Sequence, residues 1–118
     1  METLFFLNIA LIFAHELDAI YRHEWRFFQA LLGLSERMSD EAFYRVFTAL
    51  HIPLLVVILW AAPSRAFQIG FDIFLMIHLG LHIGLRRHPL IDFNNPFSFA
   101  LIGAAALGGA LHLLLLLL

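Results

Sequence analysis

The chain has 118 residues, of which 62% are apolar and only 14% are charged. A soluble domain is about one quarter charged, so this composition excludes an ordinary soluble domain and indicates several membrane spans of about 20 residues each. The sequence contains no cysteine, which excludes disulfides and thiolate metal sites, and its net charge of −2 argues against nucleic acid as a partner.

The first apolar segment covers residues 4–21. It is preceded by Glu2 rather than by a basic residue, and no small-residue cleavage site comes before its charged HELD stretch. A signal peptide has a basic start and a cleavage site of that kind. We therefore expect this segment to be a retained membrane span.

A polar stretch with apolar interludes follows at residues 22–45. Its apolar residues have helical spacing, and they are Phe27, Phe28, Leu31 and Leu32. An amphipathic segment of this kind lies in the plane of the membrane interface. The stretch therefore predicts a short interfacial helix between the first two spans.

Three further apolar segments cover residues 46–62, 67–85 and 97–118. Ser39 or Asp40 is a candidate N-cap for the helix of the second span. Pro96 suits the first turn of the last helix, with Asn95 or Asn94 as its cap. The four segments together predict an all-α fold, an integral membrane four-helix bundle that forms a single domain over residues 1–118.

Small residues in the last two spans predict close packing of helices. Gly80 and Gly84 are four residues apart in the third span, and the fourth contains Gly103 and Gly108. Small residues at such spacing let helix backbones approach each other in lipid. We expect these glycines to include helix-contact positions.

The arginines predict the orientation in the membrane. Six of the seven flank the first and third connections, and Arg65 alone flanks the second. Basic residues are enriched in cytoplasmic loops. The bias predicts that the first and third connections are cytoplasmic and that both termini are outside.

Ionisable side chains occur inside the apolar segments, all near the predicted cytoplasmic end. They are His15, Glu16, Asp18, His51, His78 and His82. At about 1.5 Å per helical residue, the histidines lie roughly 6 to 12 Å inward from the nearest arginine. An ionisable residue at this depth is costly, and it indicates a functional site by default.

The histidines of this layer predict a metal site. His78 and His82 are four residues apart and share one helix face, and we expect His15 and His51 to add ligands from other helices. Imidazole and carboxylate suit a transition metal, with Zn or Fe favoured. Asp18 and Glu16 are candidate ligands, orienting groups or catalytic bases.

Several other polar residues are expected to lie outside this site. His23, Glu24 and His88 are interpreted as surface residues. Asp72 is interpreted as a helix N-terminal charge near the outer surface. His112 belongs to the outer half of the last span, away from the predicted metal site.

The motifs FAHELDAIYRHEWR, YRVF-x-x-x-H-x-P, FQIGFD-x-F, HLGLH, RRHP and FN-x-P follow one another along nearly the whole chain. In these motifs the chain resembles an uncharacterised family of small four-helix bacterial membrane proteins. The resemblance implies a four-span fold in a bacterial inner membrane and no particular activity. Zinc-dependent membrane amide hydrolases also have an HxxxH pair on one span, but they have seven spans, so this likeness is an analogy only.

Three functions are compatible with these features. The first is a membrane metalloenzyme that uses a metal-activated water or oxygen on a membrane-soluble substrate. The second is a non-enzymatic accessory subunit that associates with other membrane subunits or with itself, with histidines that ligate haem or a chlorophyll-type pigment. The third is proton or ion movement, which the scarcity of polar groups in the outer half disfavours.

Overall fold

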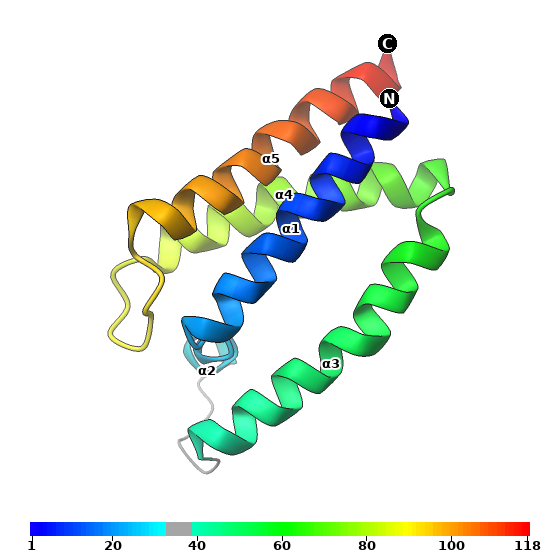
Figure 1. Ribbon diagram of the computed structural model, residues 1–118. Helices are drawn as coiled ribbons and strands as arrows, with labels where there is room; N and C mark the ends of the chain where they lie inside the picture. The colour runs from blue at the N-terminus through cyan, green and yellow to red at the C-terminus, as the bar shows by residue number, and fades with distance from the viewer. Residues whose placement is uncertain (33–38) are drawn as a thin grey trace.

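The computed structural model describes residues 1–32 and 39–118, and these residues form five α-helices and no strand. In chain order the helices are α1 (Glu2–Tyr21), α2 (Arg26–Leu32), α3 (Asp40–Ala61), α4 (Arg65–Leu85) and α5 (Pro96–Leu117). Four of them are long and apolar enough to cross a membrane, which leaves α2 as a short helix between the first two (Figure 1). The predicted all-α membrane fold is thereby confirmed.

Side-chain caps explain where three of the long helices begin. Ser39 Oγ accepts a hydrogen bond from the Ala42 amide at 3.2 Å, so α3 begins at Asp40 rather than at the predicted residue 46. Asn95 Oδ1 accepts from the Ser98 amide at 2.9 Å, and proline occupies the first position of α5 as predicted. Ser64 caps α4 in the same way.

The core lies between α1, α4 and α5. Helix α5 packs along both α1 and α4, whereas α3 stands apart over most of its length (Figure 1). Within α3 only Ile58 is buried. Leu75, Ile102 and Ala105 are fully buried at the centre of the three packed helices. The bundle is therefore three tightly packed helices with α3 as an outlying fourth.

Glycines let α5 approach its neighbours closely at two positions. A Cβ atom at Gly108 would lie 2.1 Å from Asn8 Oδ1, and one at Gly109 would lie 3.2 Å from the Asp72 carbonyl oxygen. The prediction of a helix contact is confirmed for Gly108. In the described part of the chain nothing lies within 4 Å of a Cβ at Gly80, Gly84 or Gly103, so Gly108 is the contact position among the four glycines that were expected to include one.

Candidate metal centre

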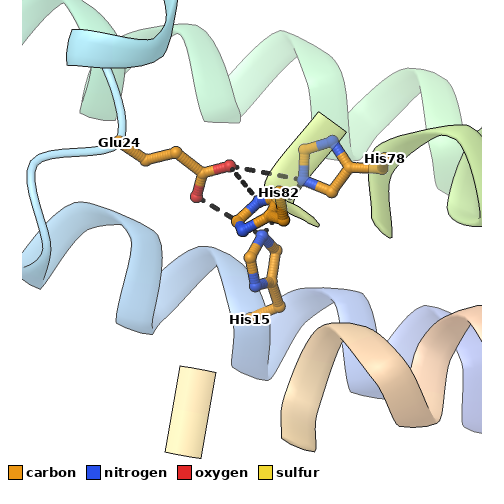
Figure 2. Close-up of side chains that lie close together, drawn as sticks. All are labelled: His15, Glu24, His78 and His82. Atoms are coloured by element: carbon orange, nitrogen blue, oxygen red, sulfur yellow. Dashed lines mark hydrogen bonds and ion pairs between the residues drawn. The ribbon is translucent and has the colours of Figure 1, made fainter. Parts of the chain in front are cut away.

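Three histidines and one glutamate converge between α1, α4 and the turn that precedes α2 (Figure 2). His15 comes from α1, His78 and His82 come from one face of α4, and Glu24 comes from the turn. We call these four residues the His/Glu cluster. His15 and His82 are 1% exposed and Glu24 is 5% exposed, so these three residues are enclosed by protein, whereas the His78 side chain is 14% exposed.

A Schellman turn at the end of α1 brings Glu24 into the cluster. The Glu24 amide donates to the Ala19 carbonyl at 2.9 Å, and the His23 amide donates to the Ile20 carbonyl at 3.4 Å. His23 occupies the left-handed conformation that this motif requires, with φ of 57°. The turn reverses the chain, so a residue beyond the helix end points back toward His15.

Several polar atoms of the cluster lie as close together as the ligands of one metal ion. His15 Nε2 lies 3.1 Å from His78 Nε2 and 3.3 Å from Glu24 Oε2. Glu24 Oε1 lies 3.3 Å from His78 Nε2 and 3.0 Å from His82 Nε2. Four ligands about 2.0–2.1 Å from a tetrahedral zinc ion are about 3.3 Å from one another. The four observed distances are close to that value, they involve both carboxylate oxygens of Glu24, and one ligand atom from each residue lies within 4.8 Å of the others.

The electrostatic environment suits Glu24 to be a ligand. Burial alone would raise the pKa of its carboxyl, but hydrogen bonds from His15, His78 and His82 outweigh burial and hold this pKa well below its usual value. The carboxyl is therefore ionised at neutral pH. Metal ligands must be deprotonated, so Glu24 already has the required form.

Aromatic rings hold the imidazoles in place. The Phe93 ring lies 4.1 Å from the His82 ring, and Phe27 lies 5.1 Å from it, measured between centroids. Nδ1 of His15 and Nδ1 of His82 are buried and have no hydrogen-bond partner within residues 1–32 and 39–118. Packing against Phe27 and Phe93, rather than a hydrogen bond to Nδ1, therefore orients the His82 ring, and the His15 ring packs against the rings of His78 and His82.

The structure brings three of the four predicted metal ligands together and leaves His51 apart. His51 is on α3, where its Nε2 pairs with Glu16 Oε2 at 2.5 Å and its Nδ1 donates to the Phe47 carbonyl at 2.7 Å. Glu16 points away from His15, as the helical spacing indicates. The Glu16–His51 pair connects α1 with α3 beside the cluster.

Asp18 also lies outside the His/Glu cluster. Its Oδ2 accepts a hydrogen bond from Ser98 Oγ at 2.5 Å, and its Oδ1 is 3.8 Å from Arg22 Nε. Asp18 therefore ties α1 to the first turn of α5. It reaches neither the metal ligands nor the Glu16–His51 pair, so its predicted role in the site has no geometric support.

A second buried polar pair lies in the other half of the bundle. Asp72 Oδ2 is 2.6 Å from His112 Nδ1, which links α4 to α5, and both side chains are at most 1% exposed. The interpretation of Asp72 as a helix-terminal charge near the surface is wrong, because this residue lies two turns inside α4. His112 is separate from the cluster, as expected.

Sequence reasoning missed Glu24 and interpreted it as a surface residue, which is wrong. It comes three residues after α1 ends, so counting depth along a straight helix places it outside the membrane. A Schellman turn usually has glycine at its residue with positive φ, and histidine occupies that position here. The sequence contains one further signal, the second His-Glu pair of the chain at His23 and Glu24. Helical spacing cannot predict where this pair lies, because it follows the end of the helix.

Comparison with known proteins gives a family and no activity. No curated protein and no solved structure gives a significant match to the chain. One family model matches residues 1–118, which is the whole sequence, and it is described as a family of unknown function. This match agrees with the resemblance seen in the motifs in one respect, because both assign the chain to an uncharacterised family. The chain belongs to the family of unknown function DUF6713.

Proposed function

We propose that this protein is a membrane metalloprotein in which His15, Glu24, His78 and His82 hold one transition-metal ion. One observation carries the proposal, namely the convergence of three Nε2 atoms and one carboxylate within 4.8 Å of one another. Three imidazoles that face a single point in an apolar interior are costly unless something satisfies them together. An ion at that point would accept a lone pair from each.

The ligand chemistry favours Zn or Fe. Imidazole and carboxylate suit Zn, Fe, Cu and Mn, whereas the chain offers no thiolate to favour a softer ion. A complete tetrahedral set of four protein ligands is typical of zinc. A haem or chlorophyll-type pigment is disfavoured, because His15 and His78 approach within 3.1 Å and leave no space for a macrocycle between them.

An enzymatic role is supported by a cavity that reaches the proposed metal. Glu24 and His78 both line a cavity of about 330 Å³, so the cluster is closed on the His15 and His82 side and accessible on the other. A purely structural ion needs no such access. With four protein ligands already in place, the ion would have to take a fifth ligand from the cavity, a small molecule or a water, which it would polarise as a Lewis acid or activate.

Metal stoichiometry in purified variants tests the proposal. We expect about one metal ion per chain in wild-type protein purified without chelator, measured by elemental analysis. The variants His15→Ala, His78→Ala, His82→Ala and Glu24→Ala should lose it. The double variant Asp72→Leu with His112→Leu is the control, because His112 is equally buried but lies outside the cluster and the double change leaves neither partner of this pair unpaired; it should retain the ion. A metal-free wild type, or equal retention in all five variants, would refute the proposal.

A further inference from the structure

The cavity beside the His/Glu cluster has apolar walls and two polar features. Its walls come from α1, α2, α3 and α4, and they include the aromatic rings of Phe27, Phe47 and Phe74. The polar features are the accessible side of the cluster and the Glu16–His51 pair. Both lie within a space otherwise made of hydrocarbon, so an occupant has an apolar body and a polar end.

The cavity opens toward lipid. Leu50 and Leu54 of α3 line it, and they are 59% and 46% exposed on a helix that stands apart from the bundle. Lipid is the surrounding medium at the depth of the hydrocarbon core, so the side of the cavity that is left open beside α3 faces lipid. An occupant therefore enters from the bilayer, and a volume of 330 Å³ takes on the order of ten non-hydrogen atoms at roughly 30 Å³ each.

With the proposed ion, the charges around the cavity would leave one positive charge unbalanced. A divalent ion with three neutral imidazoles and the Glu24 carboxylate would carry a net charge of +1. Both ring nitrogens of His51 face oxygens, the Phe47 carbonyl and the Glu16 carboxylate, so the Glu16–His51 pair holds two protons and has no net charge. Asp18 faces Arg22. An uncompensated charge in an apolar interior is strongly unfavourable, and a single anion would neutralise it.

Resting on the proposed metal, we infer that this cavity binds a lipid-soluble monoanion, namely a medium-chain carboxylate. Its carboxylate lies at the accessible side of the cluster, next to Glu24 and His78, and its chain lies along the phenylalanine and leucine walls. The apolar walls favour the hydrocarbon tail of the ligand, and the unbalanced positive charge favours its anionic head group. A neutral alcohol of equal length satisfies only the first requirement, and acetate satisfies only the second.

Binding of octanoate to Co²⁺-loaded protein in lipid nanodiscs tests the inference. Octanoate has ten non-hydrogen atoms, and the visible bands of Co²⁺ report a change in its ligands. We expect octanoate to change these bands and to bind at least about tenfold more tightly than acetate or 1-octanol.

Two variants of α3 test whether the cavity is the binding site. Leu54→Trp fills the cavity and should weaken octanoate binding at least about tenfold while Co²⁺ stoichiometry stays unchanged. Leu59→Trp is the matched control, because Leu59 is on the same helix, is 61% exposed and lies outside the cavity lining. It should bind octanoate as the wild type does.

The outcomes separate the two proposals. If the protein binds Co²⁺ but octanoate is no better than acetate and 1-octanol, the metal site stands and the ligand inference falls. The same conclusion follows if Leu54→Trp binds octanoate as tightly as Leu59→Trp. If the wild type binds no metal at all, the proposed function falls and the ligand inference falls with it.

Discussion

Gly108 on α5 gives the sharpest test of how the bundle packs. Replacing it with alanine puts a Cβ atom 2.1 Å from Asn8 Oδ1 and 3.2 Å from Asn8 Cγ. Asn8 is 0% exposed, so its side chain is surrounded by protein and has to shift against its neighbours to make room. Overpacking of this kind typically costs about 1–3 kcal/mol. We expect Gly108→Ala to lower the free energy of unfolding by an amount in that range.

Gly103 is the matched control for this substitution. It is on the same helix, and nothing in the described residues lies within 4 Å of a Cβ placed there. Gly103→Ala should be neutral or stabilising by up to about 1 kcal/mol, because alanine is the better helix former. Unfolding in mixed detergent micelles, followed by circular dichroism, measures both free energies.

A double variant assigns the cost to the contact itself. Asn8→Ala removes the atoms that the new methyl group would meet, so Gly108→Ala should cost much less in an Asn8→Ala background than in the wild type. The difference between the two costs is the coupling energy of residues in contact. If Gly108→Ala is tolerated as well as Gly103→Ala, or if the two changes are additive, the close approach of α1 and α5 at Asn8 is refuted.

Three further predictions concern the turn, the second polar pair and the orientation. His23→Gly should stabilise the fold by about 1 kcal/mol in the same unfolding assay, because glycine adopts the positive φ without strain. Its metal content should equal that of the wild type, and a destabilised variant would contradict the prediction. Asp72→Leu alone should cost about 3–5 kcal/mol, whereas the double variant with His112→Leu should recover most of that loss, because removing one partner leaves a buried polar group unpaired. Reporter fusions at Leu118 and at Met38 should report outside and cytoplasmic positions respectively, and a cytoplasmic signal at Leu118 would overturn the orientation drawn from the arginines.

The sequence was sufficient for the long helices and for three of the four residues of the His/Glu cluster. Hydropathy identifies the spans, and the four-residue spacing of His78 and His82 fixes their common face on any regular helix. His15 followed from depth along its own helix. These features depend on one helix at a time, so local periodicity captures them.

The features that could not be predicted depend on how separate elements meet. His51 has the expected depth, but depth says nothing about its partner, and His51 pairs with Glu16 of α1 beside the cluster rather than joining it. Asp72 and His112 pair across α4 and α5, which no pattern within either helix reveals. Glu24 depends on a backbone reversal at a histidine, where the usual glycine signal is missing.

The order of the metal ligands along the chain has a consequence for biosynthesis. His15 and Glu24 lie near the beginning of the chain, and His78 and His82 lie in the third of four spans. Helix α3 separates the two groups and contributes no ligand. An ion at this site would therefore cross-link two distant parts of the chain. The cross-link would close a long loop that contains α3, as a disulfide closes a loop. Such a cross-link can form only after α4 has been synthesised and inserted, so metal loading would be a late step in assembly.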